Sequence, residues 1–296
     1  MKRNFSESDK IYSWILLLIL SVIWGSSFIL IKKGLEYFTP LQVGTLRMTF
    51  AFLVMLPFAL RRLNKIPGKD WKFIAFTGLI SNLVPAVLFA LAQTKLESSL
   101  TGILNALSPL FTLVFAVLLF KFKVNSYQIA GFLLGFSGII IFSLINSTGG
   151  LGNMNLYVWL IVLATICYAI SLNFIKYYLS DIDSLTITSL ALMIAGPVSM
   201  LILFTTDFSD RITMSSDFFT AMICIAVLGI VGTAIALVLY TKLIHMTTPV
   251  FASSVTYLVP VVAIIWGLLD NEVIYTLHFA GMAFILLGIY FSNKSG

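Results

Sequence analysis

The chain has 296 residues, of which 59% are hydrophobic and only 10% are charged, and its mean hydropathy is +1.03. Soluble domains carry about 25% charged residues, so this composition excludes a water-soluble protein and indicates one built for lipid. The formal net charge of +6 comes from basic residues concentrated in loops, where it reports membrane orientation and gives no evidence for a nucleic-acid partner.

Apolar runs long enough to cross a bilayer recur along the whole chain. Each run must be helical, because lipid offers no hydrogen-bond partner to an open backbone. The connecting loops are short, so no segment is long enough to form a soluble domain. The ten predicted spans are 12–31, 40–60, 72–93, 98–120, 127–145, 155–177, 184–205, 218–241, 249–268 and 276–292.

The distribution of lysine and arginine predicts the orientation. If the chain starts in the cytoplasm, 13 basic residues lie inside and four outside, with Arg47 inside the second span. This bias predicts a cytoplasmic tail 1–11, an external connector 146–154 and a cytoplasmic end 293–296. A bias of basic residues towards the cytoplasmic side is typical of a multi-pass protein of a bacterial-type plasma (inner) membrane.

The two halves of the chain are weakly similar and in register. Shifting one half by 151 residues places Gly78 on Gly229 and Pro109 on Pro260, and a shift of 144 places Lys32 on Lys176. We therefore predict two repeats, 12–145 and 155–292. Five spans per repeat is an odd number, so the second repeat enters the membrane from the opposite side. The predicted fold is an all-α membrane protein of ten transmembrane helices, arranged as two inverted five-helix repeats around a central cavity.

Several short motifs resemble the EamA family of the drug/metabolite transporter superfamily. Trp24-Gly25-Ser26-Ser27-Phe28 is similar to the opening signature of that family, and Leu46-Arg47 after Pro40 resembles its second span. The segments around Pro109 and Pro260 resemble its fourth and ninth spans, and the resemblance covers about 14–292. It implies a ten-helix bundle with a central cavity that exports amino acids, metabolites or drug-like solutes. The second copy departs from the first, since Ala191 stands opposite Arg47.

The spans contain almost no ionisable side chain. All twelve acidic residues fall in loops or at span ends, and His245 and His278 lie in or near loops. Proton- and sodium-coupled carriers often use an intramembrane carboxylate, and pumps for organic cations need one as a counter-ion. We therefore expect neutral or zwitterionic solutes and either a facilitator or a coupling mechanism that the sequence does not reveal. No metal site or cofactor is indicated, because Cys167 and Cys224 both lie in apolar runs.

The polar, aromatic and proline residues of the spans supply the candidate site. Arg47 has two possible roles. In the structural one it snorkels or pairs with backbone carbonyls, and in the functional one its guanidinium binds a substrate carboxylate. Asparagine is costly to leave unpaired in lipid, and aromatics either line the cavity or pack in the bundle. The candidate substrate-binding residues are Trp24, Arg47, Asn82, Phe89, Asn105, Tyr168, Ser171, Thr256 and Tyr257, and the candidate hinges are Pro109 and Pro260.

The sequence thus predicts a carrier that exports small neutral or zwitterionic metabolites, with amino acids as the favoured substrate class, by alternating access. Its expected partners are the lipid bilayer and the solute, and its oligomeric state is left open. The alternative within the class is efflux of hydrophobic drug-like solutes. An intramembrane enzyme is disfavoured because the spans lack a nucleophile–base pair, and a non-transporting receptor or subunit is disfavoured by the repeats.

Overall fold

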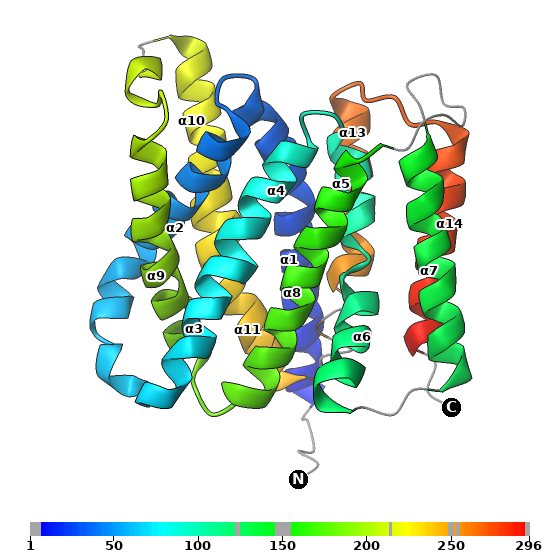
Figure 1. Ribbon diagram of the computed structural model, residues 1–296, viewed down its shortest axis with the longest axis horizontal. Coiled ribbons are helices and arrows are strands. Elements are labelled where there is room, and N and C mark those ends of the chain that lie inside the picture. Colours follow the sequence, from blue (N-terminus) through cyan, green and yellow to red (C-terminus); the bar gives the residue numbers. More distant parts are fainter. Residues whose placement is uncertain are drawn as a thin grey trace.

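The computed structural model describes residues 7–121, 125–145, 155–212, 215–247, 252 and 255–293, so the predicted connector 146–154 lies outside the described residues. The described residues form helices and no strand (Figure 1). The first helix begins at Glu7, inside the predicted tail 1–11. The α-helices are α1 (Glu7–Leu35), α2 (Pro40–Leu60), α3 (Trp71–Gly78), α4 (Val84–Ala92), α5 (Ser98–Asn105), α6 (Ser108–Phe120), α7 (Ser126–Leu144), α8 (Tyr157–Tyr178), α9 (Ser184–Phe204), α10 (Ser216–Gly229), α11 (Ala236–Met246), α13 (Val255–Leu269) and α14 (Thr276–Asn293).

The helices fall where the spans were predicted. Eight helical segments are long and apolar enough to cross a membrane. The ninth and tenth predicted spans appear as shorter apolar helices within the described residues, Val255–Leu269 and Thr276–Gly288. The prediction of an all-helical, multi-pass membrane protein is therefore confirmed. The boundaries differ from the predicted ones by a few residues, as expected where helix ends fray.

Three spans are not continuous α-helices, and of these the sequence indicated only the fourth, where Pro109 is a candidate hinge. The third is wound as a π-helix over Leu79–Leu83, between α3 and α4, and the eighth over Ile230–Ile235, between α10 and α11. The fourth is broken between α5 and α6, directly before Pro109. Proline lacks an N–H and cannot continue a preceding α-helix without losing a bond, so the break falls where the ring is tolerated.

The two π-helical segments share one local device. Asn82 donates its side-chain Nδ2–H to the Thr77 carbonyl at 2.8 Å, and Thr233 donates its hydroxyl to the Leu228 carbonyl at 3.1 Å. Both bonds reach back five residues. Wider winding leaves carbonyls without their usual partner, and in each span a polar side chain fills that place.

Glycines allow close contact between segments of the two halves of the chain. A Cβ on Gly229 at the end of α10 would lie 2.6 Å from the Arg47 carbonyl oxygen of α2. A Cβ on Gly78 at the end of α3 would likewise collide with the Ala191 carbonyl oxygen of α9. Only glycine fits at these two contacts, as is typical where membrane helices approach each other closely.

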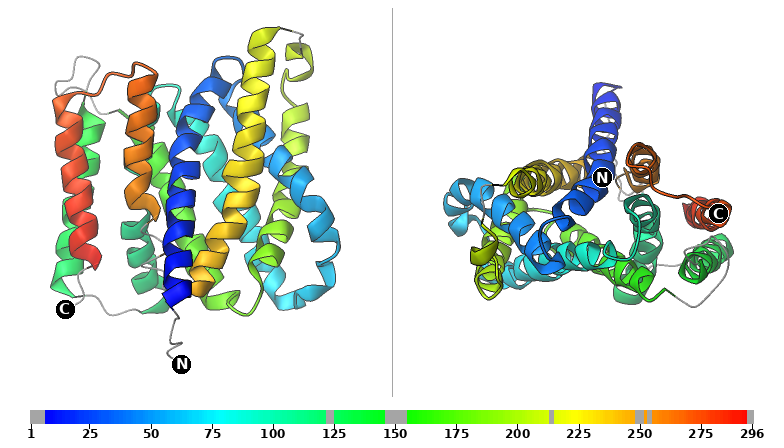
Figure 2. Two further views of the ribbon diagram at one scale, coloured as in Figure 1. Left: turned by 180° about the vertical axis from the view of Figure 1, so that it is seen from behind. Right: turned by 90° about the horizontal axis from the view of Figure 1, so that it is seen from above.

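Helices α7 and α14 pack together along their length at one edge of the bundle (Figure 2). A Cβ on Gly288 would lie 2.6 Å from the Gly131 carbonyl oxygen, and one on Gly138 would lie 2.8 Å from the Gly281 carbonyl oxygen. The glycines of both helices therefore meet backbone to backbone, as in close-packed membrane helix pairs.

The bundle has two distinct ends. Helix α1 begins and α14 ends at the same end, which we call the terminal face (Figures 1 and 2). The connections between α4 and α5 and between α13 and α14 lie at the other end, which we call the opposite face. This arrangement follows from an even number of spans.

Candidate functional site

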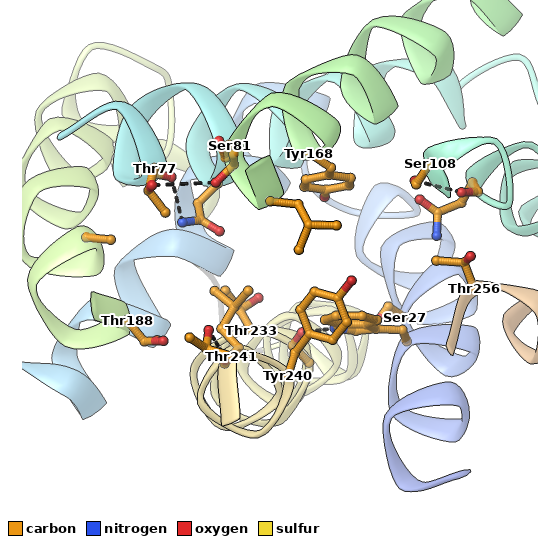
Figure 3. Close-up of a pocket in the computed structure, with 18 of the residues that line it drawn as sticks. Ser27, Thr77, Ser81, Ser108, Tyr168, Thr188, Thr233, Tyr240, Thr241 and Thr256 are labelled. Atoms are coloured by element: carbon orange, nitrogen blue, oxygen red, sulfur yellow. Dashed lines mark hydrogen bonds between the residues drawn. The ribbon is translucent and has the colours of Figure 1, made fainter. Parts of the chain in front are cut away.

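A cavity of about 150 Å³ lies inside the bundle (Figure 3). Its described lining comes from α1, α2, both helices of the third and fourth spans, α8, α9, the eighth span and Thr256 of α13. Helices α7 and α14 contribute none of the described lining residues. Towards the terminal face the lining extends to Ile175, Thr188 and Ile244, and towards the opposite face it ends at Phe28, Ile31 and Phe89.

Aromatic rings form much of the wall. Trp24 of α1 donates its indole N–H to the Gly232 carbonyl at 3.1 Å, and its ring meets Tyr240 edge-on with the centroids 4.7 Å apart. Phe89 lies between Phe28 and Tyr168, at centroid distances of 5.8 and 5.9 Å. These contacts fix the rings, so the wall is formed before any solute binds.

The two asparagines differ in how much of their amide is free. Asn82 uses its Nδ2–H for the Thr77 carbonyl, and its Oδ1 is left for other partners. Asn105 is 7% exposed and lines the cavity at the broken fourth span, and the structure gives its side-chain amide no partner among the described residues. Asn105 is the last residue of α5, and the chain turns there before α6 begins. The break in the fourth span therefore helps to leave the Asn105 amide without a described partner. This amide can both donate to and accept from a solute.

Arg47 carries the one formal charge among the described lining residues. Its Nε–H donates to the Thr233 hydroxyl at 2.7 Å, which joins the second span to the π-helical segment of the eighth. No ion pair connects it to a carboxylate within the described part of the chain. A guanidinium keeps its proton, so a solute with a carboxylate would supply the missing negative charge.

Most of the predicted site residues come together in this cavity. Nine of them line it: Trp24, Arg47, Asn82, Phe89, Asn105, Pro109, Tyr168, Ser171 and Thr256. Tyr257 and Pro260 are not among its lining residues. Near them α1 and α13 are in close contact, since a Cβ on Gly25 would lie 3.0 Å from the Val259 carbonyl oxygen. Pro260 also lies inside the unbroken helix α13, unlike Pro109.

Other lining residues were not predicted. Small hydroxyls escape notice because a serine or threonine in a membrane helix usually bonds its own helix. One signal could have found Thr233, since it stands 151 residues after Asn82 in the repeat alignment. The polar lining residues outside the candidate set are Ser27, Thr77, Ser81, Ser108, Thr112, Thr188, Thr233, Tyr240 and Thr241.

The described residues contain no group of three or more His, Cys, Asp or Glu that could hold a metal ion. Cys167 and Cys224 are free thiols. The chemistry of the cavity therefore consists of one guanidinium, neutral amides and hydroxyls, and aromatic faces. Such a surface binds and orients a small solute.

The architecture is that of a polytopic membrane protein with a small cavity between its helices, whose wall is largely apolar and carries a few polar groups. A solved structure superposes on it with a TM-score of 0.64 over 95% of this chain and 96% of that chain, at 16% identity, which supports the fold. The EamA-like transporter family matches residues 12–144 and 155–294, so the chain belongs to this family and is a membrane transporter.

Relatives come from distant organisms. The uncharacterised inner membrane transporter YedA of Escherichia coli K12 is 26% identical over 92% of this chain and 88% of its own length. An uncharacterised transporter of Archaeoglobus fulgidus is 24% identical over 94% of this chain and 97% of its own. The WAT1-related protein At3g02690 of Arabidopsis thaliana, a chloroplastic protein, is 24% identical over 95% of this chain and 69% of its own. The resemblance inferred from the sequence motifs is confirmed.

Proposed function

We propose that this protein exports small neutral or zwitterionic metabolites, with amino acids as the favoured substrate class, by alternating access. The observation that carries the proposal is the lining of the cavity, where Arg47 is the only described charge and stands among neutral polar and aromatic groups. An α-carboxylate would bind the Arg47 guanidinium, and the faces of Trp24, Tyr168 or Tyr240 would accept an ammonium group. The described lining holds no carboxylate, histidine or thiol that could act as a catalytic base or nucleophile, which favours transport over chemistry.

The size of the cavity favours small solutes over drug-like ones. Pockets that bury drug-sized ligands measure about 300–1,000 Å³. The cavity here measures about 150 Å³. Efflux of hydrophobic drug-like compounds remains the alternative, and it requires a wider state of the bundle than this one.

Matched features in the two halves support inverted repeats, 12–145 and 155–292, around a central cavity. The π-helical segments begin at Leu79 and Ile230, which are 151 residues apart. Gly78 packs on Ala191 in the other half, and Gly229 packs on Arg47 in the first, so equivalent contacts are exchanged between the halves. Inverted repeats allow one carrier to adopt inward-open and outward-open states that mirror each other.

We infer the membrane orientation from the basic residues, 13 of which the predicted topology assigns to the side of the termini and four to the other side. We place both termini in the cytoplasm of a cell with a bacterial-type plasma (inner) membrane, and the connector 146–154 outside. A reporter enzyme that is active only outside the cytoplasm should stay inactive when it is fused after Gly296. Activity of that fusion would reverse the orientation.

Efflux of radiolabelled amino acids from proteoliposomes, with and without an imposed pH gradient, tests the function. We expect efflux of a neutral amino acid down its gradient, at a similar rate in both conditions, because no carboxylate lines the described cavity. Strict dependence on the pH gradient would refute the facilitator mechanism and leave export standing. Failure to move any of the amino acids, together with efflux of a hydrophobic dye, would favour the alternative.

Replacing Asn105 with leucine should lower solute efflux while the protein remains in the membrane at its normal abundance. Leucine keeps the number and branching of the side-chain heavy atoms and suits lipid, and it removes the amide that has no described partner within the protein. We expect a loss of about three- to tenfold, as for one or two neutral hydrogen bonds. Asn173→Leu is the control, since the Asn173 amide donates to the Thr112 and Ala169 carbonyls and its loss should act on stability. Unchanged efflux by the Asn105→Leu protein would remove this residue from the site.

A further inference from the structure

A cluster of charged side chains joins three distant segments at the opposite face. Lys32, near the end of α1, donates to Asp270 Oδ2 at 2.7 Å and to Glu272 Oε1 at 2.9 Å in the loop between α13 and α14. It also lies 3.4 Å from Glu97 Oε2, in the turn before α5. Lys33 adds a bond of 3.0 Å to Asp270 Oδ1. One end of α1 is thus tied to two connections that belong to different halves of the chain.

Glu272 is the buried centre of this cluster, and its side chain is 0% exposed. Its carboxylate accepts hydrogen bonds from the Ser98 N–H at 2.9 Å, the Ser98 hydroxyl at 2.7 Å and the Ser99 N–H at 2.9 Å. Burial by itself would raise the pKa of the Glu272 carboxyl, but the bonds from Lys32, Ser98 and Ser99 lower it to about 2. A carboxyl group whose pKa is lowered in the folded protein stabilises the folded state at every pH above its ordinary pKa. This stabilisation is lost only as the pH falls towards the pKa of about 2 in the folded protein. The cluster therefore remains intact throughout the physiological range.

The cluster lies directly beyond the end of the cavity. Ile31 lines the cavity and precedes Lys32 in the chain. Together with Phe28 and Phe89 it forms a buried apolar layer, with exposures of 2%, 5% and 2%. Opening the cavity to the opposite face along α1 requires α1 to separate from α5 and from the α13–α14 loop. That separation would break the bonds of Lys32 and leave Glu272 buried without its cation, which is costly.

The described residues of the terminal face form no such cluster, and their one ion pair joins Arg62 to Asp183 at 4.0 Å. The repeat register places Lys176 in the position of Lys32, and the shift of 151 places Leu119 and Lys121 in the positions of Asp270 and Glu272. A lysine therefore stands where Glu272 supplies the central carboxylate. In the described part of the chain Lys176 forms no ion pair, and its Nζ lies 5.5 Å from the Tyr177 ring centroid. At the terminal face, contacts equivalent to those of Lys32 would bring Lys176 next to another basic side chain, and like charges repel.

We propose that Lys32, Asp270 and Glu272 form a one-sided ionic latch, which holds the cavity shut at the opposite face and makes the empty carrier rest open towards the terminal face. The closing role rests on the contacts alone. Only the statement that the resting state is inward-open rests on the proposed function and orientation. Loss of the latch makes the two states more equal in free energy, because the described residues of the terminal face offer only the Arg62–Asp183 pair, 4.0 Å apart, against it.

Accessibility of a single cysteine tests the latch without any transport assay. Cys167 and Cys224 are replaced by serine and Ser27, which lines the cavity, by cysteine. A charged, membrane-impermeant maleimide is then added to sealed vesicles of either orientation. We expect the parent to be labelled from the terminal face, and Lys32→Met and Glu272→Gln to be labelled from the opposite face about tenfold faster than the parent or more.

Lys95→Met is the matched control, since Lys95 lies on the same face, is exposed and forms no ion pair within the described residues. It removes the same charge and should leave labelling unchanged. Glu272→Gln keeps the shape of the side chain and guards against a variant that fails to fold, and abundance in the membrane is measured for all variants. Equal labelling of the parent and of both latch variants from the opposite face would overturn the latch. If the fusion after Gly296 reports an external terminus, the latch stands, while the inward-open resting state and the export direction fall.

Discussion

Replacing Arg47 with methionine should reduce efflux of carboxylate-bearing solutes by about 10- to 100-fold, since a hydrogen bond to a charged group contributes about 1.5–3 kcal/mol. Methionine replaces the unbranched stem of the arginine side chain and suits an apolar bundle, so the change removes the guanidinium with its charge and its N–H donors. Kinetics of efflux in proteoliposomes measure the effect. The corresponding amino-acid amides, which lack the carboxylate, should be transported by the variant and by the parent at similar rates.

Two further variants separate binding from packing at this position. Arg47→Lys keeps the charge but not the planar fork, and should retain part of the efflux. Thr233→Val removes the acceptor of the Arg47 Nε–H, which is 2.7 Å away, and keeps the charge. If Arg47→Met lowers efflux of amides as strongly as that of acids, or lowers membrane abundance, Arg47 is a structural residue that joins α2 to the eighth span.

Replacing Gly229 with valine should prevent the bundle from assembling. A Cβ at this position would lie 2.6 Å from the Arg47 carbonyl oxygen and 2.7 Å from Phe50 Cβ. The backbone of α2 cannot move away without disturbing the cavity wall, so we expect a loss of about 3 kcal/mol or more, at the upper end of overpacking costs. Abundance in the membrane and thermal unfolding in detergent measure it.

Gly68→Val provides the matched control, because a Cβ on Gly68 would meet nothing within 4 Å. The same substitution there should leave abundance and unfolding temperature almost unchanged. A stable, abundant Gly229→Val protein would show that α2 and α10 are further apart than the structure places them.

The spans and the family could be predicted because they depend on composition and local order. Twenty apolar residues form a helix in lipid regardless of what surrounds them, so the helices lie where hydropathy places them. The π-helical windings could not be predicted in this way. They become recognisable only when Asn82 and Thr233 are seen to bond the carbonyls of Thr77 and Leu228, five residues back.

The rotation of each helix was harder to predict than its position. Thr256 and Tyr257 were both proposed for the site, but consecutive residues point about 100° apart on a helix, and only Thr256 lines the cavity. The ionic latch was missed for another reason. Glu272 lies in a loop, as predicted, but its burial depends on α1 and α5, which are distant in the sequence.

The pairing of α7 with α14 has a consequence for how such proteins diversify. These helices meet through glycine backbones at one edge, and the described residues that line the cavity all come from the other spans. A substitution that changes which solute fits need not touch this pair, and a substitution in the pair need not alter the solute. Selection for solute specificity and selection for helix assembly can thus act on separate sets of residues. A lineage can therefore change the solute that it transports while the α7–α14 pair stays the same.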